Sequence, residues 1–142
     1  MQLDLENLTT AQQVIDPVVA TADVTSEAID LAGFNAVNIA VLVGESGDTL
    51  SGSVKVELEV QESDDDSTYT ACADADITNA VTGTNTGTFA VIDAAAEDDA
   101  CYQVKYLGDK QYVKVVANLT GTHTNGIPIG VVAFKSGENY LP

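Results

Sequence analysis

The chain has 142 residues, with 22 acidic side chains against five lysines and a formal net charge of −17. This balance argues against a nucleic-acid-binding surface and against a site for anionic membranes, since both depend on clustered Lys and Arg side chains. The length fits one domain with a sizeable core, and the scarcity of His, Cys and Arg side chains argues against an enzyme.

The first 26 residues differ from the rest of the chain. Apolar side chains are scattered there and Pro17 interrupts them, so two interpretations of 1–26 stay open: a first edge strand with a loop, or an extended N-terminal arm that packs on a neighbouring subunit. Frequent strand signals over 27–135 predict a β-sandwich domain, and 136–142 is expected to be a C-terminal tail. Neither a signal peptide nor an apolar stretch long enough to span a membrane is visible, so we expect synthesis in a cytoplasm.

Short runs of apolar and β-branched residues recur from residue 28 onwards and predict strands. Turn clusters rich in Gly, Asn, Asp and Ser separate them, and Asn125-Gly126 is a favourable hairpin turn. The expected strands span 28–31, 35–43, 53–61, 68–72, 77–81, 88–92, 101–107, 111–119 and 127–134.

Two of these segments differ in how their side chains alternate. In 53–61, apolar residues alternate with Lys, Glu and Gln, which predicts one face in the core and one in water. In 35–43, NAVNIAVLV, both alternating sets contain apolar side chains. This second pattern predicts a central strand that is buried on most of both faces.

The number and spacing of the strand signals predict the fold class. The strands recur every 8–12 residues or so and no long helical pattern intervenes, which is typical of an antiparallel sandwich or jelly roll. We therefore expect an all-β protein, an antiparallel, jelly-roll-like β-sandwich with an extended N-terminal arm. An immunoglobulin-like strand order stays open as the alternative.

The chain offers little catalytic chemistry. Its one histidine, His123, precedes the Asn125-Gly126 turn, and no Ser or Cys lies beside it in a recognisable catalytic motif. An exposed turn histidine is the expected role. We predict no catalytic residue and no cofactor.

Two acidic clusters are candidate cation sites. Asp64, Asp65 and Asp66 form one, and the loop over 93–99 forms the other. Calcium needs several converging oxygen ligands, and neither cluster has the glycine and glutamate spacing of an EF-hand loop. Solvated turns are therefore expected, with Asp64, Asp65 and Asp66 as weak candidates for metal binding.

Cys72 and Cys101 allow two interpretations. They are too few for a zinc site without several histidines, and a pair of free, partly buried thiols is one interpretation. The other is a disulfide between neighbouring strands, which a cytosol would not favour but which could form after release from the cell.

The tyrosines allow a second class of function. Paired carboxylates serve glycosidases, but the chain has no Trp to build an aromatic platform. Carbohydrate binding without catalysis would use tyrosines, although tyrosines on strands are more often core or cross-strand partners. The candidates are Tyr69, Tyr102, Tyr106 and Tyr112.

Three groups of residues resemble a known family. They are 30–37 (DLAGFNAV), Glu62-Ser63-Asp64-Asp65 followed by Tyr69-Thr70, and 102–108 (YQVKYLG) followed by 112–115 (YVKV). Over roughly 28–134 the chain resembles the head decoration, or cement, proteins of tailed bacteriophages.

The resemblance implies a structural protein of the virion. It implies binding to the phage major capsid protein at the head surface, a homotrimer at three-fold positions, and no catalytic residue. The alternative, from the residues themselves, is a non-catalytic carbohydrate- or calcium-binding module of a fibre or secreted protein.

Overall fold

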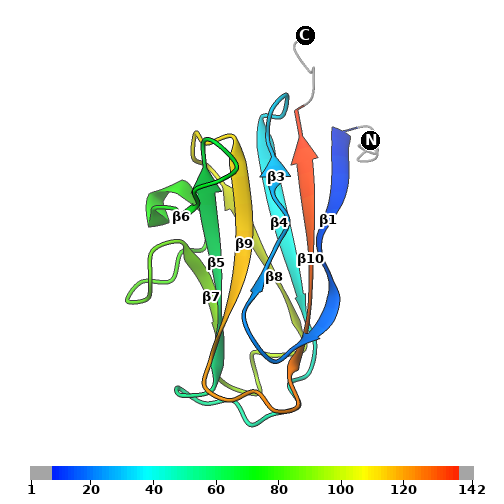
Figure 1. Cartoon of the computed structure of the whole chain (residues 1–142), viewed down its shortest axis with the longest axis vertical. Helices are drawn as coiled ribbons and strands as arrows, with labels where there is room; N and C mark the ends of the chain where they lie inside the picture. Colours follow the sequence, from blue (N-terminus) through cyan, green and yellow to red (C-terminus); the bar gives the residue numbers. More distant parts are fainter. Residues whose placement is uncertain (1–7, 138–142) are drawn as a thin grey trace, which may run out of the picture.

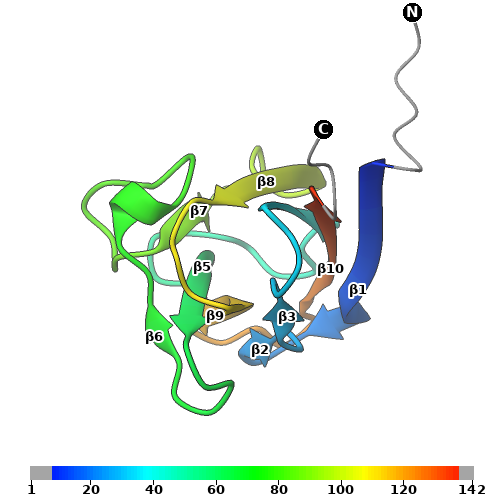
Figure 2. The ribbon, with the colours of Figure 1, turned by 90° about the horizontal axis from the view of Figure 1, so that it is seen from above.

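Two antiparallel sheets lie face to face in the structure, a computed structural model that describes residues 8–137 (Figures 1 and 2). The strands are β1 (Thr9–Ala20), β2 (Val24–Thr25), β3 (Ile29–Asp30), β4 (Ala36–Val43), β5 (Lys55–Ser63), β6 (Thr70–Ala71), β7 (Thr88–Ile92), β8 (Ala100–Tyr106), β9 (Tyr112–Thr120) and β10 (Ile127–Ser136). The four-stranded sheet has the order β1-β10-β4-β8. The six-stranded sheet has the order β2-β9-β5-β6, with β3 beside β9 and β7 beside β5.

The strand pairs are nested along the chain. β1 pairs with β10, β2 and β3 pair with β9, β4 pairs with β8, and β5 pairs with β7. Successive pairs fall alternately in the two sheets, as in one long hairpin rolled around a core, which is the jelly-roll arrangement. The predicted antiparallel sandwich is confirmed.

The core lies between the inner faces of the two sheets. Alternate side chains of each strand point inward, so the period of two that marks a strand also selects the core residues. In β4 and β10 of the four-stranded sheet these are Val37, Ile39, Val41, Val43, Ile127, Ile129, Val131 and Ala133, and in β5 and β9 of the other sheet they include Val56, Leu58, Val60, Val113, Val115 and Ala117.

Residues 9–20 form an edge strand and not a free arm. β1 pairs with β10 from Thr9 to Ala20, and its Val14 and Ile15 side chains are buried in the core. For residues 9–20, the structure therefore agrees with the edge-strand interpretation of 1–26. Residues 1–7 lie outside the described residues. At the other end β10 continues through Ser136, and 138–142 lie outside the described residues.

The strand expected at 77–81 is wrong. Ile77 makes only an isolated bridge to Tyr106, and it follows a short 3-10 helix, η1 (Asp74–Asp76). The segment instead follows the outer edge of β8, where Thr78 N donates to Lys105 O and Thr78 Oγ accepts from Lys105 N.

No helix in the described part of the chain is both long enough and apolar enough to cross a membrane.

Both edges of the four-stranded sheet are partly blocked against strand addition. At β8, the bonds from Thr78 and a bond from Asn79 Nδ2 to Gln103 O occupy the edge. At β1, the pairing with β10 shifts register twice around residues 13–18, and Pro17 lies in this irregular stretch. Bulges, proline and covering segments are the usual devices that prevent edge-to-edge association.

Candidate interaction surface

His123 is buried, so the expectation of an exposed turn histidine is wrong. The residue is 4% exposed, its Nε2 lies 3.1 Å from Thr120 O, and its Nδ1 has no hydrogen-bond partner. Its polar contact is with the backbone at the end of β9 and not with a nucleophile. A local turn signal did not reveal this burial, because the packing that produces it comes from the two sheets together.

The three carboxylates of Asp64, Asp65 and Asp66 point to different partners. Asp65 Oδ1 accepts hydrogen bonds from Ser63 Oγ and from the backbone N–H groups of residues 67 and 68. These bonds lower the pKa of the Asp65 carboxyl. Asp64 pairs with Lys110 at 2.8 Å, and Asp66 accepts from the Tyr69 hydroxyl. The three carboxylates therefore stabilise a turn and do not converge on one point.

The acidic loop over 93–99 is also held by hydrogen bonds from backbone N–H groups to its carboxylates. Glu97 Oε2 accepts from the N–H groups of Asp93 and Ala94, and Asp98 Oδ2 accepts from Ser46 N. Across residues 8–137, no group of three or more His, Cys, Asp or Glu side chains is placed to hold a metal ion.

Asp48 is a structural carboxylate that the sequence analysis missed. Its side chain accepts from Asn125 N and from Gly126 N, the latter at 2.8 Å. The pKa of the Asp48 carboxyl is therefore lowered, chiefly by the bond from Asn125 N. The Asn125-Gly126 turn was visible in the sequence, but the carboxylate that fixes it lies 77 and 78 positions away.

Three of the four tyrosines named for carbohydrate binding, Tyr69, Tyr102 and Tyr106, make contacts within the fold, and Tyr112 is a half-buried residue at the start of β9. Tyr106 is 4% exposed and its hydroxyl donates to Glu62 Oε2. The Tyr69 ring lies 4.1 Å beneath the ammonium of Lys114, and the Tyr102 hydroxyl donates to the backbone carbonyl of residue 97. These rings do not form an open platform.

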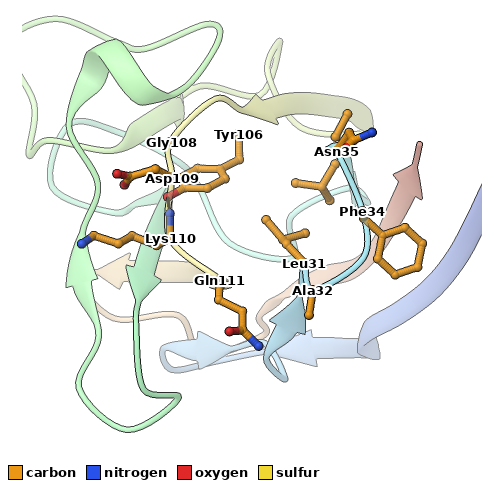
Figure 3. Close-up of a pocket in the computed structure, with 11 residues that line it drawn as sticks. Leu31, Ala32, Phe34, Asn35, Tyr106, Gly108, Asp109, Lys110 and Gln111 are labelled. Carbon is orange, nitrogen blue, oxygen red and sulfur yellow. Dashed lines mark hydrogen bonds between the residues drawn. The ribbon is translucent and has the colours of Figure 1, made fainter. Parts of the chain in front are cut away.

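A hollow of about 280 Å³ lies between the 31–37 segment and the 106–111 segment (Figure 3). Two of its polar side chains have partners within the fold: Tyr106 Oη accepts from Lys110 N, and Gln111 Nε2 donates to Asp30 Oδ1. Two of the segments that carry the family resemblance, 30–37 and 102–108, thus form opposite walls of one structural feature.

Both cysteines are free thiols in the structure, but they are not both partly buried. Cys72 follows β6 in the six-stranded sheet and is fully buried, whereas Cys101 lies exposed on the outer face of the four-stranded sheet. Burial, aided by the nearby Glu62 carboxylate, raises the pKa of the Cys72 thiol to about 12.

We expect the two thiols to react at very different rates. At pH 8 and low micromolar protein, Cys101 should react with a disulfide reagent more than about a hundredfold faster than Cys72, which needs both exposure and a thiolate to react. Colour development with Ellman's reagent measures this, and Cys101→Ser should abolish the fast phase. Absence of a fast thiol in the wild-type protein, with two released by reductant under denaturing conditions, would show a disulfide instead.

Outside the bulge of β1, the outer face of the four-stranded sheet carries no carboxylate. Asp16 lies in the bulge and accepts a hydrogen bond from Gln13 at the edge of this face. Register places its side chains: residues opposite each other in β1, β10, β4 and β8 point to the same side. We call this surface the carboxylate-free face; it comprises Ala11, Gln13, Val19, Pro128, Gly130, Val132, Phe134, Ala36, Asn38, Ala40, Leu42, Cys101, Gln103 and Lys105.

Exposed apolar side chains gather on this face. Among the described residues five large hydrophobic side chains are exposed, and three of them, Val19 at 57%, Leu42 at 53% and Phe134 at 37%, belong to it. A shallow hollow of about 480 Å³ lies beside Phe134 and Lys105. The opposite outer face, on β5 and β9, carries Lys55, Glu57, Glu59 and Lys114 instead.

No protein-family model matches the chain, and no match was found among curated proteins. Among solved structures, the SPBc2 prophage-derived protein YomS is similar at 15% sequence identity and a TM-score of 0.37, covering 91% of this chain and 93% of that one. The CBM22-1–GH10 modules of Clostridium thermocellum xylanase 10B are similar at 14% identity and a TM-score of 0.40, covering 94% of this chain and 27% of that one.

Proposed function

We propose that this chain is a non-enzymatic structural protein of a bacteriophage particle, which decorates and stabilises the head by binding the major capsid protein. The observation that carries the proposal is the use of its chemistry-bearing side chains. His123, Cys72, Tyr106, Asp48 and Asp65 are committed to burial or to hydrogen bonds within the fold. The surface of the molecule is therefore what is left to bind a partner.

The fold and charge suit such a role. A jelly roll with most strand hydrogen bonds internal to two packed sheets is a rigid body that withstands the conditions a particle meets outside the cell. A net charge of −17 keeps decorated particles apart and soluble. The resemblance over roughly 28–134 is what points to the specific partner. Two of the segments that carry it form opposite walls of one hollow.

The carbohydrate- and calcium-binding alternative finds less support. Three of the four tyrosines it requires are used within the fold, and the carboxylates of Asp64, Asp65 and Asp66 diverge. The same purified protein would reveal it through a calcium-dependent rise in melting temperature or through binding to a glycan panel.

Particles made with and without the gene test the proposal. We expect the full chain in purified particles of the phage that encodes it, and loss of the gene should lower by several degrees the temperature at which heads release DNA. Adding the purified chain back to deficient heads should restore this temperature and should co-sediment with them. Complete particles that contain none of the chain would overturn the proposal.

A further inference from the structure

Two central strands of the four-stranded sheet are apolar on both sides, yet the fold covers only one side. β4 has Val37, Ile39, Val41 and Val43 in the core, while its outer positions include Ala40 and the exposed Leu42. β10 follows the same pattern. A strand with apolar residues on both faces is typical of a sheet covered on both faces.

The other sheet supplies the comparison within the same molecule. β5 alternates core residues with Lys55, Glu57, Glu59 and Gln61, as expected for a sheet with one face in water. The absence of carboxylates from the outer face of β4 and β10 is therefore a local property. It stands out in a chain with 22 acidic residues.

We propose that the carboxylate-free face is the surface through which two copies of this chain pair face to face. A second copy is the occupant that the charges favour, because this face lets two acidic molecules meet without placing carboxylates opposite each other. Sheets that pack in this way lie about 10 Å apart, and a small residue such as Ala40 allows that approach.

A two-fold axis that crosses the strands at the level of Ala40 and Val132 makes the face self-complementary. These two residues are cross-strand partners. The axis places Phe134 of one copy towards Gly130 of the other, since the two lie on either side of Val132 in β10. The Phe134 ring would there meet Pro17, which lies over Gly130.

The same axis brings opposite charges together. Among the described lysines, Lys105 is the one whose ammonium has neither a carboxylate nor an aromatic ring as a partner. It lies on β8, and the acidic residues Asp98 and Asp99 precede the other end of that strand. Reversing the strand direction directs Lys105 of each copy towards the acidic end of its partner.

The area is sufficient for a specific contact. A four-stranded face with a ten-residue central strand covers roughly 600 Å² per copy at standard strand spacing. Two such faces bury about 1,200 Å², the lower end of the range for stable interfaces. Pro17 with its bulge and the 77–79 segment interrupt the two sheet edges, which favours association through the face.

A pair differs from the trimer that the family resemblance implies. One face that meets its own copy closes in a two-fold, whereas a three-fold ring needs two different contact surfaces on every copy. The pairing is also independent of head binding, so either proposal can fail without the other.

Sedimentation of the full chain tests the pairing. Over roughly 1–500 μM protein we expect a reversible shift from 14.7 kDa to twice that mass. The dissociation constant should fall by about tenfold between 20 and 200 mM NaCl, because salt screens the repulsion between two net charges of −17 and spares the apolar contact. A chain that stays monomeric over the whole range, or that forms trimers, overturns the proposal.

Three single substitutions that each add one carboxylate place the contact. Ala40→Glu and Leu42→Glu lie on the carboxylate-free face and should weaken pairing by about a hundredfold or more, because like charges would meet across the interface. Thr120→Glu, exposed on the opposite outer face, should leave pairing unchanged. Pairing that survives both substitutions on the face places the contact elsewhere and refutes the proposal. Slower reaction of Cys101 with thiol reagents at pairing concentrations provides a second readout on the unmutated chain.

Discussion

A chain that begins at residue 21 is expected to be unfolded at 25 °C. The deletion removes β1, whose Val14, Ile15 and Ala20 are each no more than 5% exposed. Burial of a Val or Ile side chain stabilises the folded state by about 1.5–3 kcal/mol, and the hydrogen bonds to β10 are lost as well. The sum approaches the whole stability of a domain of this kind, about 5–15 kcal/mol.

The deletion also uncovers β10. With β1 gone, one side of a central strand loses its backbone partners from Ile127 to Ser136, and an open apolar edge promotes aggregation. Far-UV circular dichroism and a thermal melt of the shortened chain would show the outcome. A cooperative melt near that of the full chain would mean that β1 is dispensable and that the arm interpretation holds for 1–20.

Point substitutions in β1 separate the core contribution from the pairing. Ile15→Ala is expected to lower the free energy of unfolding by about 2–4 kcal/mol, since the site is buried and leaves a cavity. Val18→Ala, at a position that is 43% exposed on the same strand, should cost less than about 1 kcal/mol. Equal effects at both positions would contradict the placement of β1.

Strands with a regular pattern were predictable, and irregular ones were not. The prediction of 88–92 coincides with β7, and 53–61 and 35–43 largely coincide with β5 and β4. β1 lacks a clear alternation because bulges near Pro17 shift its register, so alternate residues do not stay on one face. The apolar Ile77 resembles the start of a strand, but its segment bonds along β8 through the side chains of Thr78 and Asn79.

The sequence pattern predicted only part of the candidate surface. Apolar residues on both alternating sets of 35–43 predicted burial of both faces. One face is in the core, but the prediction is wrong for the other face, where Leu42 is 53% exposed. Which residues of β1, β10 and β8 share the other face depends on register between residues far apart in the chain, such as Thr9 and Ser136, which are 127 positions apart. Register of this kind follows from the folded sheet and not from any local pattern.

A short break separates β2 from β3. Both strands pair with β9, and Ser26 lies between them. There Ser26 N donates to Val115 O at 2.9 Å, and Ser26 Oγ accepts from Val115 N at 2.9 Å. The hydroxyl thus takes the place of a backbone carbonyl at the point where the strand is interrupted, and both Ser26 and Val115 are buried.

Ser26→Ala is therefore expected to lower the free energy of unfolding by about 1–3 kcal/mol, because it leaves the buried Val115 N–H without an acceptor. Ser67→Ala, the same substitution at an exposed turn, should change stability by less than about 0.5 kcal/mol. Urea denaturation at one protein concentration measures both values, and hydrogen exchange should show faster exchange of the Val115 amide in Ser26→Ala alone. If stability falls while that amide stays protected, the loss comes from packing. If neither changes, the hydroxyl does not bridge the interrupted strand, and the hydrogen bond of Val115 must be satisfied in another way.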